Sequence, residues 1–253
     1  MAVLPEHTIV EVFRPRKNEA IFSSFRVLSR YPNQVVILKG NKRISRIDPR
    51  GAGMANAFID KQQTRSFPAF TEAIGRASKG DSWCLAQLEQ RRGWALERSK
   101  NTQQAIGDQS DALAELVSNF EGHELKELRA GRSLKSETRQ KILALTTDLA
   151  DYMQVTQFGG VHIFPPPYRY NQFVWRYTLC HVIQMMQLVR QGSKRRAPEK
   201  ARNDHFDNVF ATFGTFFNGV MTNDFGTLLT HEIARVILRS LGARLASPYN
   251  AVG

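Results

Sequence analysis

The apolar positions between residues 203 and 241 are spaced for a helix, a short strand and a second helix. The first helix carries four phenylalanines on one face, at Phe206, Phe210, Phe213 and Phe217. Asn218-Gly219 has the chemistry of a helix end, and Val220-Met221-Thr222 is typical of a brief buried strand. The apolar residues of the second helix are Leu228, Leu229, Ile233, Val236, Ile237 and Leu241.

The same periodicities divide the rest of the chain into short strands and longer helices. Strands are predicted over residues 8–13, 34–38, 43–47 and 161–164, with a hairpin turn at 39–42. Helices are predicted over residues 18–31, 54–61, 66–75, 82–99 and 168–191. Residues 101–157 hold a polar stretch and two helical segments broken at Ala130-Gly131, and are expected to form a helical insertion or cap. The whole chain, residues 1–253, is expected to form one α/β domain.

Three carboxylates accompany the helix, strand and helix near the C-terminus. Asp204 and Asp207 share a helix face, and Asp224 follows the predicted strand. In α/β folds the strand ends form the crevice where ligands bind, so the three side chains are expected to converge. Converging carboxylates repel one another unless a cation with a preference for oxygen lies between them. This pattern predicts a site for Mg²⁺ or Mn²⁺.

The order of Asp207, an apolar helix, a short strand and Thr222-Asn223-Asp224 resembles the C-terminal half of a PIN-like nuclease domain. The resemblance implies a Rossmann-like parallel sheet flanked by helices and a metal-dependent endonuclease, with RNA favoured over DNA as substrate. It also implies that Asp207 and Asp224 are the principal metal ligands. Asp204 would complete the site, and Thr222 would position a metal-bound water.

The PIN-like pattern further implies an acid at the end of the first strand and a glutamate on an early helix. Asp48, at the end of a predicted strand and before a glycine-containing loop, fits the first position, with Glu11 as the alternative. Glu72 is the candidate helix glutamate, and Glu89 is its better-spaced rival. Asp48 therefore joins the three C-terminal acids as a candidate catalytic residue.

The chain is strongly basic, with 35 Lys and Arg residues against 23 Asp and Glu residues and a net charge of +12. Such an excess favours a polyanionic partner. The segment that precedes the C-terminal acids is expected to contact nucleic-acid phosphates through Lys194, Arg195, Arg196, Lys200 and Arg202. Tyr168, Arg169, Tyr170, Trp175 and Arg176 mix aromatic and cationic groups, which suits base stacking or, with greater weight, a packed aromatic core.

Cys84 and Cys180 are too few for a cysteine metal cluster and indicate reduced thiols in a cytoplasmic protein. The chain has no run of eighteen apolar residues, so no membrane span is expected. The size and charge fit a toxin or an antiviral defence nuclease. A protein inhibitor or complex partner and a homo-oligomer are left open. The rival hypothesis is a catalytically inactive nucleic-acid-binding or assembly subunit that uses the basic surface alone.

Overall fold

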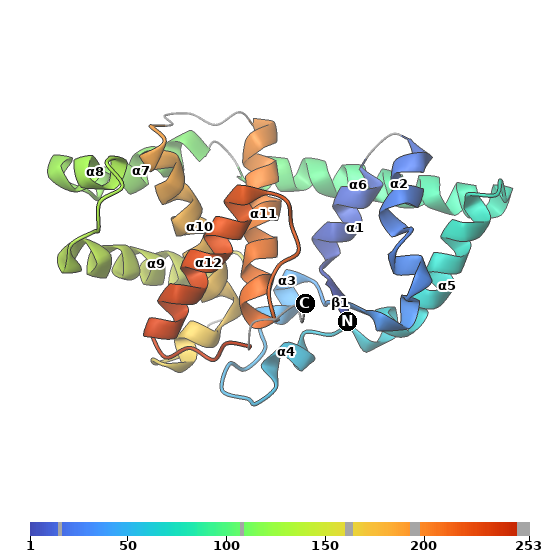
Figure 1. Cartoon of the computed structure of the whole chain (residues 1–253), viewed down its shortest axis with the longest axis horizontal. Coiled ribbons are helices and arrows are strands. Elements are labelled where there is room, and N and C mark those ends of the chain that lie inside the picture. Colours follow the sequence, from blue (N-terminus) through green and yellow to red (C-terminus); the bar gives the residue numbers. More distant parts are fainter. Residues whose placement is uncertain (15–16, 107–108, 160–163, 193–197, 247–253) are drawn as a thin grey trace, which may run out of the picture. The chain divides into compact units, whose positions relative to one another are not determined.

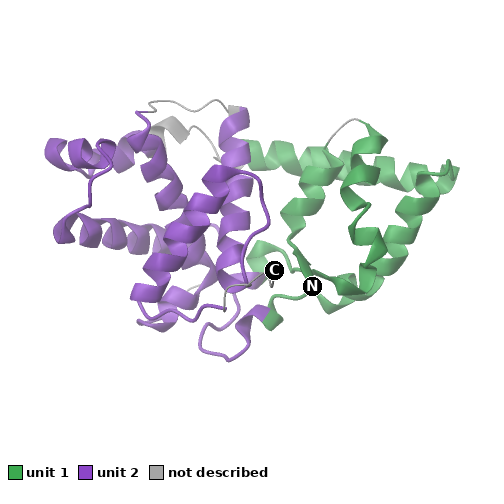
Figure 2. Cartoon of the chain, viewed as in Figure 1, with its two compact units in different colours: residues 1–43, 56–105 green, residues 44–55, 106–253 purple. Residues whose placement is uncertain are grey.

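The computed structural model describes residues 1–14, 17–106, 109–159, 164–192 and 198–246, and these are mainly helical (Figure 1). The chain divides into two compact units (Figure 2). Unit 1 comprises residues 1–43 and 56–105, and unit 2 comprises residues 44–55 and 106–253. The sequence predicts one domain over residues 1–253, whereas the contacts within the chain define these two compact units.

Unit 1 combines a small parallel sheet with a group of helices. Its elements are β1 (Ala2–Leu4), α1 (Glu6–Phe13), α2 (Asn18–Phe25), the short 3-10 helices η1 (Leu28–Arg30) and η2 (Pro32–Gln34), β2 (Val35–Ile37), α3 (Asn41–Ile44), α5 (Lys61–Ala77) and α6 (Ser82–Ile106). The two strands pair in parallel with Ala2 opposite Val35. Helices α1 and α2 form the crossover that parallel strands require.

Phenylalanine side chains make much of the core of unit 1. Phe13 of α1 and Phe25 of α2 are fully buried. The ring of Phe25 meets Phe70 of α5 edge to face, with centroids 5.3 Å apart, and also lies 6.4 Å from Phe67. Aromatic pairs at these separations contribute beyond the apolar area that they bury. The cluster thereby joins α1, α2 and α5 beside the sheet.

Unit 2 is a helical assembly built around α10. Its elements are α4 (Met54–Ala57, at the unit boundary), α7 (Gln109–Ser118), α8 (Gly122–Arg129), α9 (Ser136–Thr156), the 3-10 helix η3 (Tyr168–Asn171), α10 (Phe173–Arg190), α11 (Pro198–Phe216) and α12 (Phe225–Ser240). Helix α10 packs against α8, α9, α11 and α12. Trp175 and Leu179 are fully buried on it, as expected for a helix that is covered on nearly every side.

The predicted α/β fold is wrong. The described residues form a mainly helical structure with one two-stranded sheet, where a PIN-like sheet flanked by helices was expected. The expected strand over residues 8–13 is helix α1, because Ile9, Val10 and Phe13 also fit one helix face, and Val10 and Phe13 are buried there. Residues 41–44 form helix α3 in place of a hairpin and returning strand. Only the strand expected over 34–38 is confirmed, as β2.

The strand expected at Val220-Met221-Thr222 is also wrong. These residues form an irregular connection between α11 and α12, and Met221 is fully exposed. A strand needs neighbouring backbone to satisfy its N–H and C=O groups, and this segment pairs with no strand among the described residues. The strand expected over residues 161–164 lies largely outside the described residues. Within 101–157, the predicted break at Ala130-Gly131 is confirmed, and helices α7, α8 and α9 belong to unit 2.

Candidate nucleic-acid interface

Asp204 and Asp207 lie within α11, away from its first turn. The helix begins at Pro198, a residue favoured at the first helical position, so it starts before the predicted acid cluster. The two carboxylates are three residues apart and share a side of the helix. Asp204 is buried, and its backbone carbonyl accepts a hydrogen bond from Gln184 Nε2 of α10 at 3.0 Å. Asp204 is therefore held at the packed α10–α11 contact.

Two histidines stand beside Asp204. Burial lowers the pKa of His181, and the neighbouring carboxylate of Asp204 opposes this shift. Burial, together with the nearby His181, lowers the pKa of His205 to about 4. His205 Nδ1 is 2.9 Å from the hydroxyl of Tyr177. Both imidazoles are consequently neutral at pH 7, and His205 is held in place by a hydrogen bond.

Asp224 begins α12 as its N-cap residue. Its Oδ1 accepts hydrogen bonds from the backbone N–H of Thr227 at 2.6 Å and from the Thr227 hydroxyl at 2.9 Å. Thr222, the predicted supporting residue, accepts a hydrogen bond from the Asp224 N–H through its hydroxyl at 3.0 Å. These contacts satisfy backbone donors at the helix start. Capping of α12 is therefore the local function of Asp224.

Helices α11 and α12 run in the same direction. A Cβ at position 214 would lie 2.8 Å from His231 Cδ2, so glycine lets the two helices approach closely there. One turn later along both helices, Arg235 Nη1 donates to the backbone carbonyl of Phe217 at 3.4 Å. The contacts move towards the C-terminal end on both helices, so the two helices run parallel.

The parallel direction places Asp207, in the middle of α11, and Asp224, at the start of α12, at a similar level along the two helices. Asp207 is seven residues before Gly214, and Asp224 is seven residues before His231. At 1.5 Å per residue, both lie about 10 Å along their helices from the contact. Within the described ranges, however, no three His, Cys, Asp or Glu side chains are arranged to hold a metal ion. Among the described residues, the acids therefore do not form an assembled Mg²⁺ or Mn²⁺ site.

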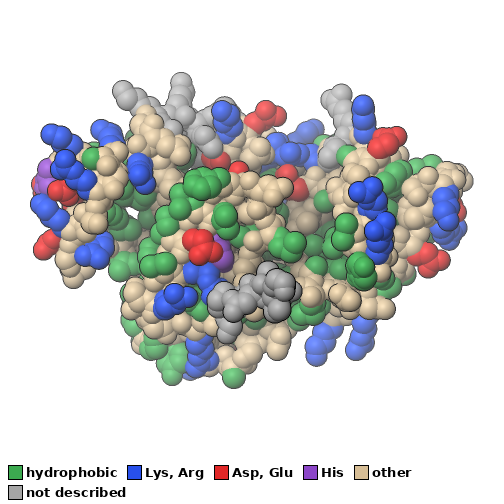
Figure 3. Space-filling view, in the orientation of Figure 1, with side chains coloured by type: hydrophobic (Ala, Val, Ile, Leu, Met, Phe, Trp, Pro, Cys, Tyr) green, Lys and Arg blue, Asp and Glu red, His purple; other side chains and the backbone are tan. Residues whose placement is uncertain are grey.

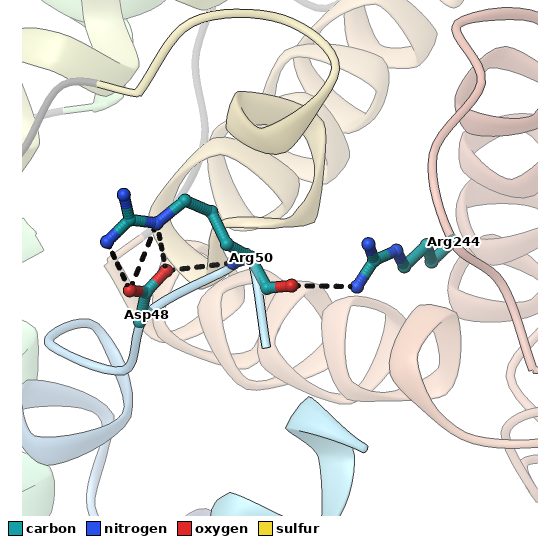
Figure 4. A network of polar contacts seen from close by, with 3 residues as sticks. All are labelled: Asp48, Arg50 and Arg244. Atoms are coloured by element: carbon teal, nitrogen blue, oxygen red, sulfur yellow. Dashed lines mark hydrogen bonds and ion pairs between the residues drawn. The ribbon is translucent and has the colours of Figure 1, made fainter. Parts of the chain in front are cut away.

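Asp48 lies away from Asp224. Both of its carboxylate oxygens accept hydrogen bonds from Arg50, with Arg50 Nη2 to Oδ2 at 2.6 Å (Figure 4). The backbone carbonyl of Arg50 in turn accepts from Arg244 Nη1 at 3.0 Å. Arg244 follows the C-terminal end of α12, a helix of 16 residues that is about 24 Å long. Asp48 therefore lies near the opposite end of α12 from Asp224.

The candidate glutamates all belong to unit 1. Glu72 is exposed on α5, and Glu11 pairs with Arg14 at 3.1 Å. Glu89 pairs with Arg92 on α6. The acids of α11 and α12 belong to unit 2, so the glutamates and these acids do not form one site within either unit.

The predicted basic segment is only partly described. Lys194, Arg195 and Arg196 lie outside the described residues. Lys200 and Arg202 lie in the first turns of α11, where Lys200 is exposed and Arg202 donates to Asn203 Oδ1 at 3.3 Å. These two cations are therefore on the helix that carries Asp204 and Asp207.

A second cationic surface of unit 2 surrounds Arg50, and we call it the Arg50 surface. It consists of Arg50, Phe164, Tyr168 and Arg244. The Arg50 guanidinium lies over the Phe164 ring at 5.4 Å from its centroid, and 61% of the side chain is exposed. The hydrogen bond with Asp48 raises the pKa of Arg50, and the nearby Tyr168 adds a smaller contribution. Arg244 is exposed, and Phe164 and Tyr168 are half-buried.

Buried contacts hold the backbone that carries Arg244. Arg176 is fully buried, and its Nη2 donates to the carbonyl of Arg244 at 2.6 Å and to Asn171 Oδ1 at 2.9 Å. The same Asn171 oxygen accepts from the Arg244 N–H at 2.8 Å. Burial lowers the pKa of Arg176 to about 9, so the guanidinium remains charged at neutral pH. The side chain of Arg244 thus extends towards Arg50 from a backbone that these hydrogen bonds hold in place (Figure 4).

The aromatic residues before and within α10 mostly serve the core. Tyr170 meets the fully buried Trp175 edge to face at 4.9 Å, and Arg176 lies 4.1 Å above the ring of Phe216. The core interpretation of this stretch is therefore confirmed for Trp175 and Arg176. Sequence reasoning did not find Arg50 and Arg244, although an arginine two residues after Asp48 is itself a signal of a local ion pair.

Comparison of the chain with protein-family models, with curated protein sequences and with solved structures gave no match. None of the helices in the described part of the chain has the length and apolar character needed to span a bilayer.

Proposed function

We propose that the protein binds single-stranded nucleic acid, and that the Arg50 surface provides its base-stacking and phosphate contacts. The observation that carries the proposal is the guanidinium of Arg50 above Phe164, beside the exposed Arg244. Two arginines against one carboxylate, Asp48, leave this surface positive. Lys and Arg side chains are also spread widely over the face seen in Figure 3, in line with the net charge of +12.

The chemistry of such a surface suits an unpaired strand. Guanidinium groups bind phosphate oxygens through paired N–H donors, and an aromatic ring offers a face to a base. Single-stranded binders combine these two contacts and have little sequence preference. The Arg50 surface presents both kinds of group within one unit, on a backbone anchored by Arg176 and Asn171.

Fluorescence anisotropy of a labelled single-stranded RNA, titrated over a range of salt, tests the proposal. R244Q is expected to weaken binding and to reduce the slope of log affinity against log salt by about 0.7, the value for one lost phosphate contact on a single strand. F164L, which keeps apolar volume and removes the ring, is expected to weaken binding by about fivefold or more.

R139Q on α9 is the matched control, because Arg139 is an exposed arginine of the same unit and the substitution changes the charge equally. R139Q should leave affinity and salt slope close to those of the wild type. If R244Q and F164L behave like R139Q in folded protein, the Arg50 surface is not the interface. Single-stranded DNA in a parallel titration shows whether RNA is preferred.

Metal-dependent phosphodiester cleavage is a second candidate function. The specific observation in its favour is that Asp204 and Asp207 lie on α11, the helix that also carries Lys200 and Arg202. Metal-dependent hydrolysis of a phosphodiester uses carboxylates that hold the cation beside the phosphate. Mg²⁺ or Mn²⁺ is the cation that these oxygen ligands would select.

Incubation of 5′-labelled RNA with Mn²⁺, Mg²⁺ or a chelator tests the second candidate. D224N is expected to reduce metal-dependent cleavage by about a hundredfold or more, the scale of losing a group that stabilises transition-state charge. Asn caps helices about as well as Asp, so α12 should remain folded in this variant. Normal cleavage by folded D224N, or no metal-dependent cleavage by the wild type, would contradict the assignment.

A further inference from the structure

An open hollow in unit 1 lies beyond the end of β2. It has a volume of about 610 Å³, and its lining includes Lys39, Arg43, Asp60 and Lys61. Lys39 is the second residue after β2, and Lys61 is the first residue of α5. The ends of parallel strands are where ligands commonly bind in open sheets, because the connecting segments diverge there.

Backbone hydrogen bonds fix the walls of the hollow. Leu38 pairs in antiparallel fashion with Ile59, and the N–H of Lys39 donates to the carbonyl of Phe58 at 2.8 Å. The N–H of Asp60 donates to the carbonyl of Ile37 at 2.8 Å. The segments that carry Lys39 and Lys61 are thereby held against the same strand.

The charges of the lining are unbalanced. Asp60 is the carboxylate in the lining of the hollow. Its Oδ1 accepts a hydrogen bond from the Gln63 N–H at 3.0 Å, and its Oδ2 lies 3.4 Å from Arg43 Nη1. Lys39, Arg43 and Lys61 supply three positive charges against this one negative charge. Lys39 Nζ donates to the carbonyl of Ala57 at 2.6 Å, which leaves two of the three ammonium donors for another acceptor.

We infer that this hollow is a binding site for a phosphate group. A phosphate offers several acceptor oxygens and a charge that the three cations can neutralise, and lysine and arginine are its usual ligands. The phosphate can belong to a small phosphorylated molecule such as a mononucleotide or to a nucleic-acid backbone. The hollow shares no residue with the Arg50 surface, so the inference does not depend on the proposed function.

Titration of the full chain with inorganic phosphate and with AMP, followed by ³¹P NMR, tests binding of small phosphorylated ligands. An anisotropy titration with a single-stranded oligonucleotide tests binding of backbone phosphates. K61Q is expected to weaken binding by about tenfold, and K61E to abolish it. K79Q is the matched control, because Lys79 is an exposed lysine just after the C-terminal end of α5. Binding to K79Q should equal binding to the wild type, which separates the hollow from general attraction to a basic protein.

Each outcome decides the inference. Weakening of phosphate and AMP binding by K61Q but not by K79Q supports a site for small phosphorylated ligands. If K61Q but not K79Q weakens binding of the oligonucleotide, and neither weakens binding of phosphate or AMP, the hollow binds backbone phosphates. If phosphate, AMP and oligonucleotide all bind K61Q and K61E as they bind K79Q, with thermal melting showing folded protein, the inference is overturned. Absence of binding by all three probes to the wild type overturns it as well.

Discussion

At the scale of single residues, Glu124 shows how contacts replace water around a buried charge. Its Oε2 accepts from Lys141 Nζ at 2.7 Å and from the Glu121 N–H at 2.9 Å, and its Oε1 accepts from the Thr138 hydroxyl at 2.8 Å. These contacts, the Lys141 hydrogen bond first, lower the pKa of Glu124 to about 2. The carboxylate therefore joins the start of α8 to α9.

The lowered pKa of Glu124 predicts a stability change in acid. A carboxyl group with a depressed folded pKa stabilises the protein above its unfolded pKa of about 4.3, and this contribution is lost as the pH falls through the folded value. E124Q is expected to unfold at a lower temperature than the wild type at pH 7. The difference should shrink as the pH falls from about 4.5 to about 2. Thermal unfolding at several pH values measures it.

E137Q is the control for this prediction, because Glu137 is exposed in the first turn of α9. It should unfold close to the wild type throughout the same pH range. If the difference in unfolding temperature between E124Q and the wild type stays constant from pH 7 to pH 2, the charge of Glu124 does not supply the stability.

At the scale of elements, the start of α12 depends on one side chain. Asp224 accepts hydrogen bonds from both the N–H and the hydroxyl of Thr227. D224A is expected to lower the free energy of unfolding by about 1 kcal/mol, the usual cost of losing an N-cap, whereas D224N should lose little. Denaturant unfolding of the two variants measures the difference.

The pair of variants at position 224 also separates capping from chemistry. Both remove the negative charge, but only D224A removes the cap. If D224A is as stable as D224N, the cap contributes nothing to α12. If both lose cleavage equally while only D224A loses stability, the carboxylate has a role beyond holding the helix.

At the scale of the whole molecule, the positive charge affects the binding of partners, whereas the packing of side chains determines the fold. A net charge of +12 predicts attraction to polyanions and a strong salt dependence of any such binding. The two units have separate cores, the phenylalanine cluster of unit 1 and the α10-centred packing of unit 2. The Arg50 surface belongs to unit 2 and the phosphate hollow to unit 1, so their contributions to binding can be measured by separate substitutions in the full chain.

The sequence by itself determined the long helices, because a periodic apolar face over several turns fits only one secondary structure. Helices α10 and α12 and the break at Ala130-Gly131 lie where the pattern predicts them. It also determined the basic charge, which is a property of composition.

Only the tertiary structure decided how the short apolar runs fold and which side chains meet. Residues 8–13 fit both a strand and a helix, and their packing against the core of unit 1 selected the helix. A strand at 220–222 required a neighbouring strand, which a local pattern cannot supply. Packing also decided the contacts of the carboxylates: Asp48 pairs with Arg50, whereas Asp207 and Asp224 lie at a similar level because α11 and α12 run parallel. Contacts between such side chains depend on how distant segments pack, and the spacing of residues along the sequence does not determine that packing.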